Sequence, residues 1–256
     1  MSTAVQFLIV CPLVFLGGFV DAIAGGGGLI SLPAYLIAGL PVHTAIGTNK
    51  VSSAMGTTLT TWKFWKQGYI MLRMAVICAV CALAGSTLGA NLALLVSDRI
   101  FKILLLVILP VTGFYVFRSK RIDTPDSGQT VSLQMYLISA ACAFIIGIYD
   151  GFYGPGTGTF LLLLLTGLAH MDLNHAAGTT KVINLATNIA ALVTYLISGN
   201  IQLILGLTAG IFGIAGNWLG ARSFTQKGVK IVKPIIFVVL IIFFIRVLWE
   251  LISESL

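Results

Sequence analysis

Two stretches of this chain are versions of one another, and they decide its fold: GGFVDAIAGGGGLISLPAYLIAGLPVHTAIGTNKV at residues 17–51 and GIYDGFYGPGTGTFLLLLLTGLAHMDLNHAAGTTKV at residues 147–182. Each has an apolar run, an aspartate, a glycine-rich break, a short apolar run and a closing G-T-x-K-V. Asp150 follows Asp21 by 129 positions, and Lys181 follows Lys50 by 131. The two stretches therefore match in the order of their features as well as in composition.

The repeat continues downstream at the same spacing. The segment AGSTLGA at 84–90 corresponds to AGNWLGA at 215–221, again 131 positions on. A spacing held over separate patches indicates an internal duplication of about 125 residues per half. The predicted organisation is a first transmembrane repeat at 1–118, a cytoplasmic linker at 119–130 and a second transmembrane repeat at 131–256. The linker region is the one clearly hydrophilic stretch and contains Pro, Gly, Ser and Asp.

The composition places the chain in a membrane. It is 58% hydrophobic and only 9% charged, against about a quarter charged in ordinary soluble domains. Long runs with few or no charges predict an all-α polytopic protein, and these runs lack the alternation of a barrel. The net charge of +7 lies mostly in short loops, where it orients the chain in the bilayer. We therefore expect no nucleic-acid partner.

The apolar runs predict about eight long transmembrane helices plus two short intramembrane helices. In the first half the long helices are expected near 5–24, 43–65, 70–96 and 100–117, and in the second near 131–149, 174–197, 201–221 and 229–252. The short helices are expected at 29–40, after the glycines at 25–28, and at 159–168, after a break at 151–158. The segment 29–40 spans only about 18 Å as a helix, short of the roughly 30 Å hydrocarbon core.

The short helices leave two topologies open. If they are re-entrant, each half has four spans and the repeats are parallel; if they cross, each half has five and the repeats are inverted. The positive-inside rule favours the inverted scheme, with both termini outside. That scheme puts two loop cations outside, Arg99 and Lys102, and ten in the cytoplasm: Lys63, Lys66, Arg73, Arg118, Lys120, Arg121, Arg222, Lys227, Lys230 and Lys233. The parallel scheme splits the same twelve evenly.

Four charges are expected near membrane depth: Asp21, Lys50, Asp150 and Lys181. A charge at depth is costly and usually faces a cavity or a partner. We expect the lysines to bind substrate and the aspartates to gate or couple transport. The alternatives are a structural ion pair between Asp21 and Lys50, and lysines that extend to the membrane interface.

The glycine breaks favour a binding site. Non-helical backbone at membrane depth occurs where protein or water lines it, and a helix that restarts there presents backbone N–H groups suited to an anion. Paired breaks in two repeats are typical of a transporter site. The alternative is that glycines only allow close packing, as expected for Gly85-x-x-x-Gly89 and Gly206-x-x-x-Gly210. Besides the two lysines, the predicted substrate-binding residues are Gly25, Gly26, Gly27, Gly28, Thr48, Asn49, Gly154, Gly156, Gly158, Thr179 and Thr180.

Signatures of an enzyme are missing. The sequence has no H-E-x-x-H, no G-x-S-x-G and no Walker A motif. Cys78-x-x-Cys81 has no second Cys or His pair near it in sequence, so packing is the favoured interpretation. We expect no catalytic residue, no metal site and no cofactor.

The quoted motifs also resemble a known family. VDAIAGGGGLISLP with TAIGTNK in the first half, and DGFYGPGTG with AAGTTKVIN in the second, are similar to signatures of the TauE/SafE family, nearest to its YfcA-like members. The resemblance covers essentially the whole chain. It implies a multi-pass carrier of the bacterial inner membrane for small sulfur-containing or other organic anions, usually with seven to eight predicted helices.

Together these observations predict a secondary transporter of small anions. The alternatives are a channel-like anion facilitator and a non-transporting membrane scaffold. The expected partners are a small-molecule anion and the lipid bilayer, and a homodimer is an open possibility.

Overall fold

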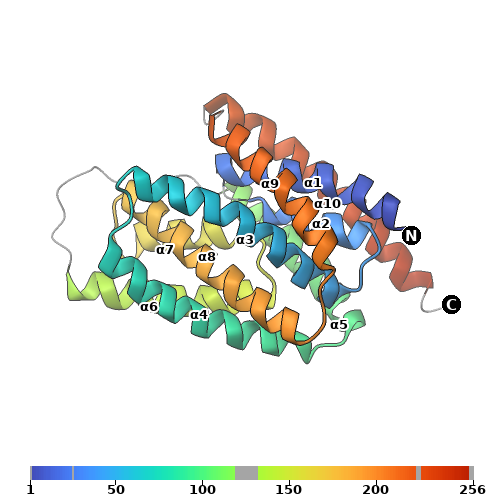
Figure 1. Ribbon diagram of the computed structural model, residues 1–256, viewed down its shortest axis with the longest axis horizontal. Coiled ribbons are helices and arrows are strands. Elements are labelled where there is room, and N and C mark those ends of the chain that lie inside the picture. Colours follow the sequence, from blue (N-terminus) through green and yellow to red (C-terminus); the bar gives the residue numbers. More distant parts are fainter. Residues whose placement is uncertain (1, 25, 119–131, 223–225, 254–256) are drawn as a thin grey trace.

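A computed structural model describes residues 2–24, 26–118, 132–222 and 226–253, and within them all regular structure is helical (Figure 1). The helices are α1 (Thr3–Ala24), α2 (Gly28–Ile37), α3 (Val42–Lys66), α4 (Leu72–Leu94), α5 (Asp98–Arg118), α6 (Leu133–Phe152), α7 (Thr157–Gly167), α8 (Leu173–Ile197), α9 (Leu203–Arg222) and α10 (Gln226–Ser253). The predicted helix bounds agree with these to within three residues. Gly25 and the linker at 119–130 lie outside the described residues.

The second glycine break is shorter than predicted. Gly151 lies inside α6 and Gly158 inside α7, so only Tyr153–Gly156 separate the two helices. Gly154 and Gly156 have φ of +99° and +88°, a left-handed backbone that glycine adopts without steric cost. Gly151 packs against α4, where an added Cβ would collide with the backbone of Ser86, so close helix packing requires a glycine there. The predicted break from 151 to 158 is therefore too long by two residues at each end.

The two halves interleave. Helix α1 packs along α9, and α6 packs along α4, so the first helix of each half contacts the other half. The duplicated AGxxxGA segment makes both contacts. A Cβ added to any of its glycines would collide with backbone of the facing helix: Gly85 with Phe144, Gly89 with Ile148, Gly216 with Phe15 and Gly220 with Phe19. Small residues at this spacing let helix backbones approach closely in a membrane. The expected packing role of Gly85-x-x-x-Gly89 is confirmed.

Corresponding helices run in opposite directions through the centre. Gly47, near the start of α3, lies against Asn200, just past the end of α8. Gly178, near the start of α8, lies against Tyr69, just past the end of α3. Helices α3 and α8 are thus antiparallel, as Figure 1 also shows. This is the arrangement that inverted repeats require, and the orientation of each half in a bilayer stays a prediction.

Helix α2 runs back along α1. The two helices pack together, and the side-chain amide of Gln6 in the first turn of α1 lies 3.5 Å from the carbonyl oxygen of Ala38, at the end of α2. The glycine break therefore closes a helical hairpin. Helix α3 then starts from the same end of the molecule, and α1 begins and α10 ends there too (Figure 1).

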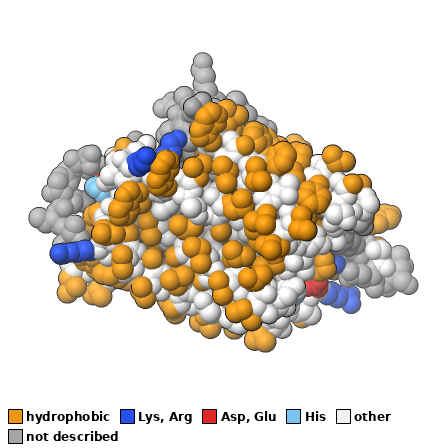
Figure 2. Space-filling model, in the orientation of Figure 1, with side chains coloured by type: hydrophobic (Ala, Val, Ile, Leu, Met, Phe, Trp, Pro, Cys, Tyr) orange, Lys and Arg blue, Asp and Glu red, His pale blue; other side chains and the backbone are white. Residues whose placement is uncertain are grey.

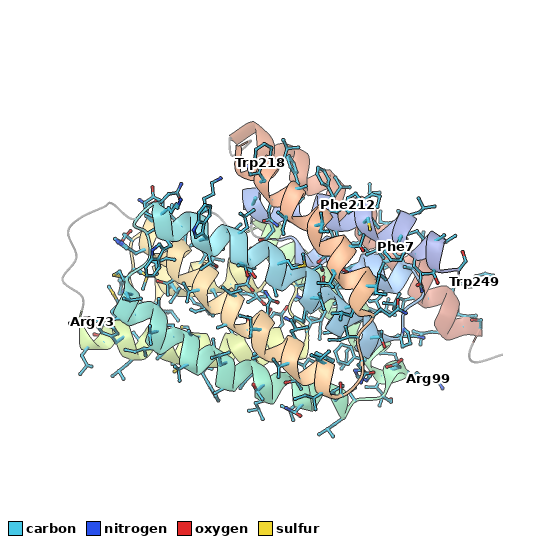
Figure 3. The ribbon with its side chains drawn as sticks, viewed as in Figure 1. Phe7, Arg73, Arg99, Phe212, Trp218 and Trp249 are labelled. Carbon is cyan, nitrogen blue, oxygen red and sulfur yellow. The ribbon has the colours of Figure 1, made fainter. Side chains whose placement is uncertain are left out.

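The surface suits a bilayer. Among the described helices, five are long and apolar enough to cross a membrane by length and composition: α1, α4, α6, α8 and α9. Figure 2 shows a face covered largely by hydrophobic side chains, and Arg73 and Arg99 lie at opposite ends in Figure 3. The apolar helices and the hydrophobic face are those of a multi-pass membrane protein. Helix α3 does not meet these criteria because it carries Thr48, Asn49 and Lys50 among its many polar residues, and the expected total of about eight spans stays a prediction.

Candidate functional site

A cavity of about 70 Å³ lies between the two halves and is lined mainly by polar groups and glycines. Helices α1, α2 and α3 form one side, and the end of α6 with α7, α8 and α9 forms the other. Its lining is Val14, Gly17, Gly18, Asp21, Gly27, Gly28, Ser31, Asn49, Lys50, Ser52, Ser53, Gly56, Thr57, Asp150, Gly154, Gly156, Thr157, Gly158, Asn184, Asn188, Gly213 and Asn217. Both glycine breaks therefore open onto one space.

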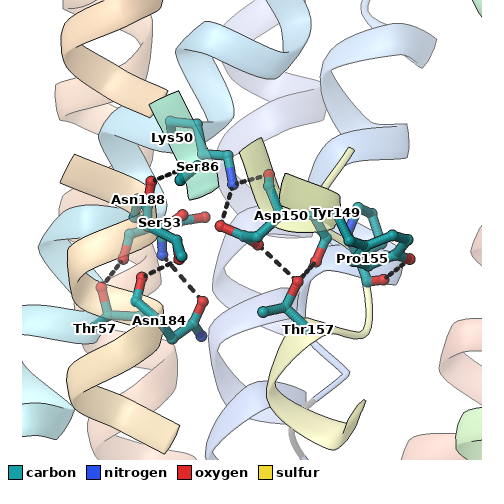
Figure 4. A network of polar contacts seen from close by, with 12 residues as sticks. Lys50, Ser53, Thr57, Ser86, Tyr149, Asp150, Pro155, Thr157, Asn184 and Asn188 are labelled. Atoms are coloured by element: carbon teal, nitrogen blue, oxygen red, sulfur yellow. Dashed lines mark hydrogen bonds and ion pairs between the residues drawn. The ribbon is translucent and has the colours of Figure 1, made fainter. Parts of the chain in front are cut away.

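Lys50 forms a buried ion pair with Asp150 from the other half (Figure 4). Its ammonium donates to the carboxylate Oδ2 and to the backbone carbonyl of Asp150, each at 2.7 Å. The hydroxyl of Thr157 donates to the other carboxylate oxygen, also at 2.7 Å. The two charged side chains are 2% and 3% exposed. Gly154 makes room for this pair, because a Cβ there would lie 3.1 Å from the lysine nitrogen.

Lys181 forms the corresponding pair with Asp21, and this pair is looser. The ammonium lies 3.3 Å from the carboxylate Oδ2, and the side chains are 12% and 20% exposed. Both pairs join a lysine of one half to the aspartate of the other. Asp21 and Lys50, the alternative pair within one half, therefore do not pair with each other. The antiparallel α3 and α8 turn each lysine toward the opposite half.

The two glycine breaks touch at the centre of the site. A Cβ added to Gly28 would lie 2.9 Å from the Cα of Pro155, so only glycine allows this approach. The phenolic hydroxyl of Tyr149 donates to the carbonyl of Pro155 at 2.6 Å (Figure 4). This hydrogen bond holds the second break in place, whereas the first half has Val20 at the position corresponding to Tyr149. The duplicated site is thus asymmetric in its sequence.

The structure brings most of the predicted residues to this cavity. Its lining includes nine of them: Asp21, Gly27, Gly28, Asn49, Lys50, Asp150, Gly154, Gly156 and Gly158. The described residues Gly26, Thr48, Thr179, Thr180 and Lys181 do not line it, and Gly25 is not described.

Thr48 has a different role. Its hydroxyl oxygen accepts a hydrogen bond from the backbone N–H of Gln202 at 2.9 Å. That contact ties α3 to the start of α9. Thr48 was predicted to bind substrate because it is close in sequence to Lys50. The helix instead turns the Thr48 side chain toward α9.

Sequence reasoning did not single out several polar residues of the cavity, notably Ser31, Thr157 and Asn217. Thr157 lies within the quoted PGTG motif, and a search for hydroxyls beside the break would have found it. Asn217 corresponds to Ser86 in the duplicated segment, so a comparison of the two copies would have shown a polar difference there. Ser31 carried no comparable signal.

Comparison with known proteins agrees with the resemblance seen in the sequence. The sequence profile of the family described as sulfite exporter TauE/SafE matches residues 10–247. The chain belongs to the TauE/SafE family. A probable membrane transporter protein ORF9 from Sinorhizobium is 34% identical over 91% of this chain and 89% of that protein.

Two further relatives carry similar names. A probable membrane transporter protein from Haemophilus influenzae is 33% identical over 87% of this chain and 86% of its own length. The probable membrane transporter protein YfcA of Escherichia coli K12 is 28% identical over 98% and 95%. No solved structure matches the chain. TauE/SafE membership and these relatives make this chain a member of a membrane-transporter family.

Proposed function

We propose that this TauE/SafE protein is a secondary transporter of small anions, either sulfur-containing or organic, in the bacterial inner membrane. The observation that carries the proposal is the Lys50–Asp150 pair, buried beside the cavity where the two glycine breaks meet. A cation at this depth needs a negative partner. Without substrate Asp150 is that partner, and an entering anion takes its place at Lys50.

The swapped ion pairs support coupling to a conformational change. Each pair joins the two halves, so a movement of one half against the other changes both. Asp21 and Asp150 then gate the site, or bind a coupling proton when an anion displaces them. The antiparallel course of α3 and α8 supports inverted repeats, a common basis for alternating access.

Binding by purified protein in detergent is the first test. Sulfite, sulfoacetate and short carboxylates are added in turn, and the midpoint of thermal unfolding is measured. A ligand at a hundredfold excess over its dissociation constant stabilises the native state by about 2.7 kcal/mol. We expect a rise with at least one anion. The variant Lys50→Met with Asp150→Asn keeps the buried site neutral, and we expect it to lose this rise while remaining folded.

Flux into proteoliposomes separates a coupled transporter from a facilitator. A coupled transporter accumulates the bound anion, and an ionophore abolishes the accumulation. Transport that never exceeds equilibrium would replace the proposal with a channel-like facilitator. No thermal shift with any anion, together with no flux, would favour a scaffold.

A further inference from the structure

The two copies of the repeat differ at a pair of facing residues on α9 and α3. Asn217 of α9 stands where the first copy has Ser86, 131 positions earlier, and Gly56 of α3 stands where the second copy has Thr187. The hydroxyl of Ser86 donates to the carbonyl of Thr187 at 2.7 Å. On the other side, a Cβ on Gly56 would lie 2.9 Å from the amide nitrogen of Asn217. The larger residue on α9 is thus matched by a smaller one on α3, which leaves room for an amide at the cavity.

The amide of Asn217 presents an unpaired acceptor. Its Nδ2 donates to the carbonyl of Gly213 at 3.0 Å, which fixes the amide orientation because that carbonyl can only accept. Its Oδ1 is buried, and no group in the described part of the chain donates to it. The residue is 6% exposed and lines the cavity. Buried polar atoms are nearly always hydrogen-bonded, so an orphan in a cavity wall points to a ligand.

Asp21 offers a second acceptor at the cavity wall. Lys50, the one cation among the lining residues, pairs with Asp150, and the cation that pairs with Asp21 is Lys181. Lys181 contacts Asp21 through one oxygen, Oδ2, and does not line the cavity. Asp21 lies one turn beyond Gly18 on α1, and a Cβ on Gly18 would lie 2.9 Å from the amide nitrogen of Asn217. Two acceptors therefore share the wall formed by α1 and α9.

Asn217 and Lys50 lie apart. Gly56, which faces Asn217, is six residues beyond Lys50 on α3, about 9 Å along the helix axis. We infer that the substrate is a small acid with an amino group at its other end, and that Asn217 is a specificity-determining residue. The acidic group binds at Lys50, and the ammonium donates to Asn217 and Asp21. This inference rests on the proposed anion site and adds the second end of the ligand.

Two matched pairs of probes test it on the full-length protein in detergent. Ethanesulfonate is compared with 2-aminoethanesulfonate, and propionate with 3-aminopropionate, so that each pair differs only by the amino group. Dissociation constants come from thermal shift and from calorimetry. A charge-assisted hydrogen bond favours the amino probe by about tenfold or more. Asn217→Ser, which restores the residue of the other copy, is expected to reduce that preference to about threefold or less.

The control is Asn91→Ser. Asn91 donates to the carbonyl four residues earlier, at 2.8 Å from Thr87, as Asn217 does to Gly213, but it is exposed on α4. We expect this variant to keep the wild-type preference. Gly56→Ala is a second variant that displaces the Asn217 amide while leaving its chemistry intact, and it is expected to lower the preference as well.

The outcomes separate the two proposals. Equal binding of both members of each pair by the wild-type protein overturns the inference and leaves the anion site standing. A preference for the amino probes that Asn217→Ser leaves unchanged removes Asn217 from that role. No binding of any of the four probes, or of the anions above, counts against the proposed function itself.

Discussion

Two ion pairs with the same residue types occupy very different environments in this protein. The Lys50–Asp150 pair is nearly inaccessible and has short contacts, whereas the Lys181–Asp21 pair is longer and partly exposed. Burial decides the cost of breaking each one, because an uncompensated charge is penalised most where water cannot reach it. The two copies of the duplicated motif therefore differ in energetics although they match in sequence.

Removing one partner of each pair tests this difference. We expect Lys50→Met to lower the free energy of unfolding by about 3–5 kcal/mol, because it leaves the Asp150 carboxylate buried without a cation. Lys181→Met is expected to cost about 1 kcal/mol or less, since its pair is partly solvated. Chemical unfolding in detergent measures both. Adding Asp150→Asn to Lys50→Met should recover part of the loss, and equal losses in the two single variants would contradict the argument.

At the scale of the helices, close packing outweighs helix propensity. Gly89 in α4 costs about 1 kcal/mol of propensity relative to alanine, yet a Cβ there would collide with the backbone of Ile148 in α6. We expect Gly89→Ala to destabilise the protein by about 1–3 kcal/mol, as overpacking does. Gly113→Ala in α5 is the control. Its Cβ would meet only the flexible end of Leu240, at 3.2 Å, so a neutral or slightly stabilising effect is expected in the same unfolding assay.

The start of α8 is set by a capping carboxylate. Asp172 accepts hydrogen bonds from the backbone N–H of His175 at 3.1 Å and from its ring at 2.6 Å. Burial raises the pKa of Asp172, but the hydrogen bonds from His175 outweigh it, so the pKa lies below its ordinary value. The cap is therefore fully charged above the ordinary carboxyl pKa of about 3.9, and its stabilisation is lost as the pH falls through the lowered value.

Substitutions at Asp172 check this cap. Asp172→Ala is expected to cost about 1 kcal/mol at neutral pH, a typical value for a lost N-cap. Asp172→Asn keeps a hydrogen-bond acceptor, so it should lower the free energy of unfolding by a few tenths of a kcal/mol at most. It should also remove the loss of stability on acidification, because an amide does not titrate. Thermal unfolding from about pH 7 to about pH 3 compares the three proteins. If the asparagine variant loses stability with falling pH as the wild-type protein does, a group other than Asp172 is responsible for that loss.

At the scale of the whole molecule, the duplication makes a prediction about sidedness. The turn after α3 and the turn after α8 are equivalent in the two halves, and both contain an open, left-handed glycine, Gly68 with φ of +76° and Gly199 with φ of +73°. Antiparallel α3 and α8 place these turns at opposite ends. If the repeats are inverted, the first turn is cytoplasmic and the second is outside.

Cysteine labelling tests the topology. Gln67 and Ser198 are exposed neighbours of the two glycines and can each be replaced by cysteine in a background without the four native cysteines. We expect a membrane-impermeant maleimide added to intact cells to label Ser198→Cys, and to label Gln67→Cys only after permeabilisation. Labelling of both from the same side would establish parallel repeats instead.

The sequence by itself determined the class of the protein, its duplication and its helices. Apolar runs and glycine breaks are local signals, so the helix ends were predicted to within three residues. The recurrence of Asp21 and Lys50 as Asp150 and Lys181 also marked the four charged residues of the two ion pairs, because a charge within an apolar run is visible in the chain alone.

Only the tertiary structure decided which of these charges meet. The pairing of Lys50 with Asp150 joins residues a hundred positions apart, and it follows from the crossing of α3 and α8 and from α1 and α6 packing on the opposite half. The same crossing turned Thr48 toward α9 and brought Asn217 to the cavity. Such contacts depend on how whole helices pack. A local sequence pattern within one helix carries no information about which other helix will pack against that helix.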